Sequence, residues 1–232
     1  GVFFFLGAGS FLVVDRHANF LFAVAIMAGL SILLLKLVFE KGSGDLIFIV
    51  LVGTIFGQLF RTLAYFLLMI ISPSEFTSLQ NKMFASFSNI NTPIVLLAGV
   101  ICVLAGGFLL RDVRRFDVAT LGRDQSTSLG VGHESLVRRT FIVSAVMVSA
   151  ATALVGPIAF LGLMVANLAR QISNTYRHAV LIPIAVLLSA VMLAAGQLIV
   201  ERYLNFGTTV TVIINFVGGI YFVVLLLREN KL

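Results

Sequence analysis

Long stretches that contain almost no charged residue recur along this chain of 232 residues, and they constrain its fold more than any other feature. Hydrophobic residues make up 59% of the sequence and charged residues only 11%, whereas a soluble domain carries about 25% charged residues. A water-soluble core has no room for so much apolar surface, so lipid must cover the remainder. The composition therefore predicts an all-α, polytopic transmembrane helical bundle.

The apolar stretches have the length of membrane-spanning helices. A helix crosses the hydrocarbon layer with about 20 apolar residues, because each residue adds about 1.5 Å. Residues 1–14 are too short for a span and start without the basic leader of a signal peptide, so we expect an N-terminally truncated chain that begins inside a helix. In one transmembrane domain, residues 1–232, the sequence predicts seven further spans at about 18–39, 45–71, 93–110, 139–155, 157–172, 180–200 and 209–227.

Two longer polar segments separate the predicted spans. Residues 72–92 are expected to hold a short surface helix, and residues 111–138 form the most charged segment. Twelve of the 16 Lys and Arg residues fall on the side of the 111–138 segment, and only three fall on the other side: Arg16, Lys82 and Arg202. Because cytoplasmic loops carry the excess of basic residues, the 111–138 segment is predicted to be cytoplasmic. The net charge of +6 follows from this distribution and does not indicate a nucleic-acid partner.

The sequence offers no machinery for energy conversion or proteolysis. It lacks the G-x-x-x-x-G-K-[ST] loop that holds ATP phosphates, so any ATP dependence must come from a separate subunit. Residues 42–45 match the G-x-G-D of intramembrane aspartyl proteases, but no other Asp lies in a predicted span to share the acid and base roles. Asp45 instead stands where a carboxylate caps a helix.

Metal binding and nucleophilic catalysis are equally unsupported by the sequence. The single cysteine, Cys102, lies in an apolar run, and the three histidines lie at span ends: His17, His133 and His178. We therefore expect no catalytic residue, no metal and no cofactor, and we interpret the chain as a transport subunit and not an enzyme.

Two segments match a known family pattern in order and spacing. Leu121 to His133 resembles a loop of the form A-x-x-L-G-[VL], and Gly156 to Arg170 resembles G-P-I-[GA]-F-[VI]-G-L-[IV]-V-P-H-[IL]-x-R. On these residues the chain resembles the FecCD-type permeases, the membrane subunits of type II ABC importers for iron-siderophores, haem and cobalamin. Ala166-Asn167 replaces the family's Pro-His pair, and Ile220 replaces a Pro of the last span. These departures favour the siderophore branch.

The resemblance implies a function and a set of partners. It implies the permease of an importer that moves ferric siderophore across the bacterial inner (plasma) membrane as a multi-pass protein. Another iron chelate, haem or cobalamin is the alternative cargo. The implied partners are a cytoplasmic ABC ATPase dimer, a periplasmic substrate-binding protein, a second permease subunit and membrane lipid. A secondary transporter is a more distant alternative, because the predicted spans lack the mid-membrane carboxylate that ion coupling would need.

The resemblance also assigns roles to particular residues. A cytoplasmic coupling loop would contact the ATPase through Leu121, Gly122, Ser128, Leu129, Gly130 and Val131. The family motif is carried by Gly156, Pro157, Phe160, Gly162, Leu163, Asn167 and Arg170. Outward basic residues at the lip would meet acidic groups of the binding protein, and the candidates there are Lys82 and Arg202, with Arg16 on the same side.

Arg61 is the one basic residue far from either end of a predicted span. It lies about 24 Å along the helix that starts at Asp45, near the outer boundary of the hydrocarbon. A charge at that depth faces protein or water, so Arg61 is a candidate for a cation that lines the outer vestibule and attracts an anionic ferric chelate. The alternative is an arginine that extends its side chain to the interface.

Overall fold

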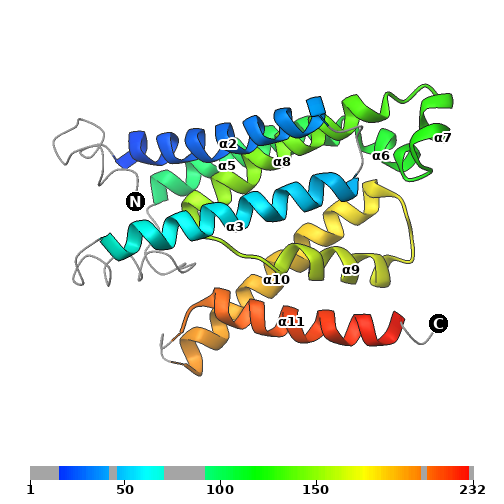
Figure 1. Ribbon diagram of the computed structural model, residues 1–232. Helices are drawn as coiled ribbons and strands as arrows, with labels where there is room; N and C mark the ends of the chain where they lie inside the picture. The colour runs from blue at the N-terminus through cyan, green and yellow to red at the C-terminus, as the bar shows by residue number, and fades with distance from the viewer. Residues whose placement is uncertain (1–15, 42–45, 71–91, 205–207, 230–232) are drawn as a thin grey trace. The chain divides into compact units, whose positions relative to one another are not determined.

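The computed structural model describes residues 16–41, 46–70, 92–204 and 208–229, which form helices and their connections without a strand in these ranges (Figure 1). The expected all-α architecture is therefore confirmed. The described residues divide into two compact units. The expected helix end at 1–14, the expected helix cap at Asp45 and the surface helix in 72–92 lie outside the described residues. A single permease domain over 1–232 stays a prediction.

The first unit contains four long helices: α2 (Arg16–Lys41), α3 (Leu46–Ile70), α5 (Thr92–Leu110) and α8 (His133–Val155). A buried cluster joins three of them, with Phe20 and Val24 from α2, Ala98 from α5 and Ala150 from α8. The two alanines are 2% and 0% exposed. Small residues at such contacts let helix backbones approach closely, which is how helices associate in lipid.

The second unit is built from two short helices and three longer ones: α6 (Val113–Ala119), α7 (Arg123–Ser128), α9 (Leu161–Ser173), α10 (His178–Arg202) and α11 (Val210–Glu229). Its core is formed by Val200 of α10 with Val210 and Ile214 of α11. A β-carbon added at Gly196 would lie 3.3 Å from Cγ1 of Val210, so the glycine allows α10 and α11 to cross closely. Figure 1 shows α9 in yellow-green and α11 in red within this unit.

Four of the described helices are long and apolar enough to cross a membrane: residues 17–38, 92–110, 133–155 and 178–202. Two other helices contain shorter apolar stretches, Val50–Phe66 within α3 and Val210–Leu225 within α11. Large apolar side chains are widely exposed on these helices, as Val103 and Leu104 of α5 illustrate with 73% and 69% exposure. A lipid environment accounts for this exposure, because soluble monomers rarely leave large contiguous apolar surfaces in water.

The expected span at 157–172 is not confirmed as a full-length helix. α9 begins at Leu161 and has 13 residues, which correspond to about 20 Å against a hydrocarbon thickness of about 30 Å. Gly156 adopts a φ of +103°, a conformation that L side chains rarely take, and Pro157 has no N–H to donate to a helix. Residues 156–160 therefore stay outside the helix. Asn174, in the left-handed conformation, ends α9.

Candidate functional site

α7 lies between two glycines with left-handed backbone conformations. Gly122 has a φ of +97° and Gly130 a φ of +81°. A β-carbon at either position would meet no atom of the described residues within 4 Å. Glycine is therefore favoured at both positions by the backbone conformation and not by a lack of space for a side chain. We call α6, α7 and their connections, residues 111–131, the α6–α7 segment; it belongs to the second unit.

Backbone hydrogen bonds join α6 and α7 into one piece. The N–H of Gly122 donates to the carbonyl of Ala119 in α6 at 3.2 Å, and the carbonyl of Gly122 accepts from the N–H of Ser126 in α7 at 3.0 Å. On the far side of α7, the N–H of Val131 donates to the carbonyl of Ser126 at 2.9 Å. Ser126 is itself completely buried. The segment is thus closed at both ends by hydrogen bonds.

Two leucines project from the α6–α7 segment. Leu121 is 52% exposed and Leu129 is 63% exposed, although both side chains are apolar. Ser128 is also exposed, and its hydroxyl donates to the carbonyl of Asp124 at 2.9 Å. Val131 is partly buried. The six residues named from the sequence for the coupling loop therefore surround one short helix, and two of them present apolar surface.

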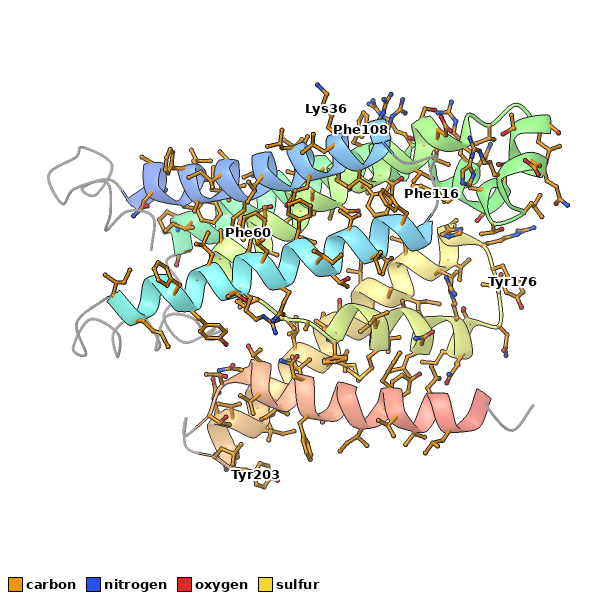
Figure 2. All side chains as sticks on the ribbon, in the orientation of Figure 1. Lys36, Phe60, Phe108, Phe116, Tyr176 and Tyr203 are labelled. Atoms are coloured by element: carbon orange, nitrogen blue, oxygen red, sulfur yellow. The ribbon has the colours of Figure 1, made fainter. Side chains whose placement is uncertain are left out.

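The carboxylate of Asp117 on α6 contacts the first residue of α10. Its Oδ1 accepts a hydrogen bond from the backbone N–H of His178 at 2.8 Å and lies 2.7 Å from the ring Nδ1 of the same residue. Because a carboxylate only accepts, the Nδ1 nitrogen carries the proton. The ring of Phe116 lies 5.8 Å from the imidazole ring, centroid to centroid. Phe116 is labelled in Figure 2.

This contact holds the pKa of Asp117 below its usual value. The largest cause is the hydrogen bond from the backbone N–H of His178, followed by the one from its ring. Partial burial acts in the opposite direction, and the positive charge of Arg177 lowers the pKa slightly further. The carboxylate is therefore charged at neutral pH. Sequence reasoning missed the pair, because no local pattern links residues 61 positions apart.

The family-motif residues lie in the connection before α9 and along α9 itself. Phe160 directly precedes the helix and packs on Gly218 of α11, where an added β-carbon would lie 2.7 Å from the β-carbon of Phe160. Gly162, Leu163 and Arg170 are exposed, whereas Asn167 is partly buried. The face of α9 that packs inside the unit is formed instead by other residues: Met164, Val165 and Ala169.

Arg61 belongs to a polar stripe along α3. Four polar residues recur at intervals of three or four positions, within an arc of about 60° on the helix, and all four are exposed: Thr54, Gln58, Arg61 and Tyr65. The spacing places their side chains on one face. Of these four residues only Arg61 was predicted as a candidate, although helical periodicity alone could have revealed the stripe.

The outward basic candidates are only partly described. Lys82 lies outside the described residues, and the side chain of Arg16 does as well. Arg202 lies in the last turn of α10 and is exposed. Its neighbour Tyr203 is 76% exposed and projects outward in Figure 2. Glu201 in the same turn accepts a hydrogen bond from Gln197 at 2.7 Å. Within the described ranges, no three His, Cys, Asp or Glu residues gather where they could hold a metal ion.

Comparison with known proteins covers the whole chain. The model of the FecCD transport family matches residues 1–228. The chain is 44% identical over 231 residues to the petrobactin import system permease protein YclO of Bacillus subtilis (strain 168), an alignment that spans 100% of this chain and 73% of that protein. It is 29% identical over 229 residues to the petrobactin import system permease protein FatC of Bacillus anthracis, spanning 99% of this chain and 65% of that protein.

A solved structure shares the fold. A metal-chelate type ABC transporter in an inward-facing conformation superposes with a TM-score of 0.76 at 22% sequence identity, over 89% of this chain and 74% of the other. At this identity the likeness concerns the fold alone.

Proposed function

The chain belongs to the FecCD transport family, and from this premise we propose that it carries ferric siderophore through an ABC importer. The observation that supports the proposal most strongly is the 44% identity to a petrobactin permease along the entire chain. A second petrobactin permease is also similar over 99% of the chain. As a member of this family, the chain is a multi-pass inner-membrane permease and a transport component, not an enzyme.

The cargo and the partners are the finer part of the proposal. Relatives at lower identity carry the names of ferric enterobactin and iron(3+)-hydroxamate permeases, so iron bound to an organic chelator is the favoured substrate class. Haem and cobalamin remain the alternative cargo. We expect the chain to work with a cytoplasmic ABC ATPase dimer, a substrate-binding protein, a second permease subunit and surrounding lipid, and without nucleic acid.

The α6–α7 segment is the proposed docking element for the ATPase. Leu121 and Leu129 offer exposed apolar surface on either side of α7, whose own residues are all polar, and full burial of a leucine contributes about 1.5–3 kcal/mol. Gly122, Ser128, Gly130 and Val131 would shape the segment so that both leucines meet the groove of the ATPase. Movement of the ATPase would then reach the membrane helices through this element.

The polar stripe of α3 is the proposed wall of the substrate path. A guanidinium that faces lipid is costly, whereas one that faces a water-filled path or protein is tolerated. Arg61 shares its helix face with Gln58 and Tyr65, which can donate hydrogen bonds. A path with one cation and several donors suits an anionic ferric chelate. Extension of the Arg61 side chain to the membrane interface remains the alternative role.

The remaining candidates would serve docking and packing. Arg202 is exposed at the end of α10, and with Lys82 it is proposed to meet acidic groups of the substrate-binding protein. The motif from Gly156 to Arg170 is proposed to fix the short helix α9 against α11. Pro157 and Phe160 would set where α9 starts, and Gly162, Leu163, Asn167 and Arg170 would lie along it.

Reconstituted transport tests the proposal. Proteoliposomes that contain the full-length permease with its second subunit and its ATPase should accumulate ferric petrobactin when the binding protein and ATP are supplied. Replacement of the phosphate-binding lysine of the ATPase should abolish accumulation. Uptake driven by an ion gradient without ATP would instead establish the secondary transporter. Preferential uptake of haem or cobalamin would overturn the siderophore assignment and leave the ABC permease in place.

A further inference from the structure

α10 begins without a cap of its own. Arg177 occupies the position before the helix, where Ser, Thr, Asp or Asn normally accepts a bond from a free backbone N–H, and its side chain makes no such bond. The N–H of His178 is instead accepted by Asp117 of α6, 61 residues away in the sequence. A carboxylate at this position is also favoured by the helix dipole. The cap of α10 is therefore supplied by the α6–α7 segment.

The same carboxylate oxygen holds the side chain of His178. The Nδ1 nitrogen lies 2.7 Å from Oδ1 of Asp117, and the Phe116 ring lies 5.8 Å from the imidazole between centroids, with the two ring planes tilted by 49°. The side chains of Asp117 and His178 are 34% and 25% exposed. Two adjacent residues of α6 thus contact His178 of α10: Asp117 binds its backbone N–H and its ring nitrogen, and Phe116 lies beside its ring.

A continuous chain of bonded elements runs from α7 to the membrane helices of the second unit. Gly122 links the two short helices, because its N–H donates to Ala119 of α6 and its carbonyl accepts from the N–H of Ser126 in α7. Asp117 joins α6 to the start of α10. α10 in turn packs closely on α11 where Gly196 meets Val210. A displacement of α7 therefore has a direct mechanical route into α10.

We infer that the Asp117–His178 contact makes α6 and the start of α10 move as one body, so that movement of the ATPase-facing helix α7 is passed into α10. The two residues are positioning residues for transport. The inference rests on the proposed function, because it assumes that an ATPase acts on α7. A cap that merely stabilised the fold would affect the amount of folded protein but not the efficiency with which ATP hydrolysis drives uptake.

The ratio of ATP hydrolysed to ferric petrobactin taken up distinguishes the two roles in the reconstituted transporter. Asp117→Ala and His178→Ala remove the contact and should each raise this ratio about tenfold. Asp117→Asn keeps an oxygen that accepts both bonds, and His178→Asn places an amide donor close to the position of Nδ1. These matched variants should stay within about twofold of the unaltered protein. The double alanine variant should be no worse than either single variant, because both remove one interaction.

Cross-linking provides a second test that does not depend on losing the contact. In a Cys102→Ser background, Asp117→Cys and His178→Cys are joined by a short bifunctional thiol reagent. If α6 and α10 move together, the cross-linked transporter keeps its uptake, and the uncross-linked double variant shows the raised ratio. Loss of uptake on cross-linking would overturn the inference, as would alanine variants with an unchanged ratio. Absence of ATP-dependent uptake in the unaltered transporter would instead refute the proposed function.

Discussion

The β-carbon of Phe160 lies 2.7 Å from the point where a β-carbon would stand at Gly218. The start of α9 and the middle of α11 are therefore in direct contact through the backbone of a glycine. In proteins, a β-carbon essentially never comes within 3.0 Å of a non-bonded heavy atom of another residue. The β-carbon of Phe160 is fixed to its backbone and cannot move aside as the end of a flexible side chain could.

Gly218→Ala should therefore destabilise the second unit. Inserting a methyl group into such a contact costs about 1–3 kcal/mol, because the backbone of one element must shift. We expect a lower melting temperature of the purified transporter and less protein in the membrane. Gly219→Ala is the matched control, since its β-carbon would meet no atom of the described residues within 4 Å. Equal losses in both variants would contradict the packing argument.

The positions of the long helices could be predicted well because charge decides where a span ends. The prediction for 93–110 differs by one residue from α5, and that for 45–71 differs by one residue at each end from α3. Both helices end where the sequence turns polar. α8 begins at His133, six residues before the predicted start at 139, because polar residues can extend a helix beyond the hydrocarbon and composition gives no sign of this.

The details of the site could not be predicted, because they depend on contacts between distant parts of the chain. Phe160 was recognised as a motif residue, yet nothing in the sequence says that it touches Gly218. Asp117 and His178 likewise lie in separate elements. The shortening of α9 had a local signal, since Gly156 and Pro157 both disfavour a helix, but the apolar run that follows outweighed it.

Leu129→Asp should weaken binding of the ATPase without unfolding the permease. Leu129 is 63% exposed, and substitutions at such surface positions usually change stability by less than about 0.5 kcal/mol. Docking would lose the burial of a leucine, about 1.5–3 kcal/mol, which corresponds to about ten- to hundredfold weaker binding. Pull-down of the ATPase by the purified permease measures this. Leu129→Met preserves the apolar surface and should bind normally, and unaltered docking of Leu129→Asp would remove α7 from the interface.

The contact at Asp117 should contribute stability only above acidic pH. Hydrogen bonds from His178 hold the folded-state pKa of this carboxyl below its usual value, which is about 3.9 in the unfolded chain. The stabilisation is therefore complete above about pH 4 and is lost as the pH falls through the folded-state pKa. The melting temperature of the unaltered transporter should exceed that of Asp117→Asn at neutral pH and converge with it in acid. A difference that stays constant with pH would show that ionisation of Asp117 is not its cause.

Arg61 offers a test of whether α3 lines the substrate path. If the guanidinium attracts an anionic chelate across partly aqueous surroundings, its removal in Arg61→Ala should reduce uptake of such a chelate about tenfold, or about 1.4 kcal/mol. Uptake of a neutral chelate should fall much less. Arg61→Lys keeps the charge and should retain most of the uptake of the anionic chelate. Gln58 and Thr54 lie on the same helix face as Arg61. Replacement of Gln58 by a large apolar residue should therefore obstruct the path and reduce uptake of the charged and the neutral chelate alike. Equal losses for the charged and the neutral chelate in Arg61→Ala would favour an arginine that anchors α3 at the membrane interface.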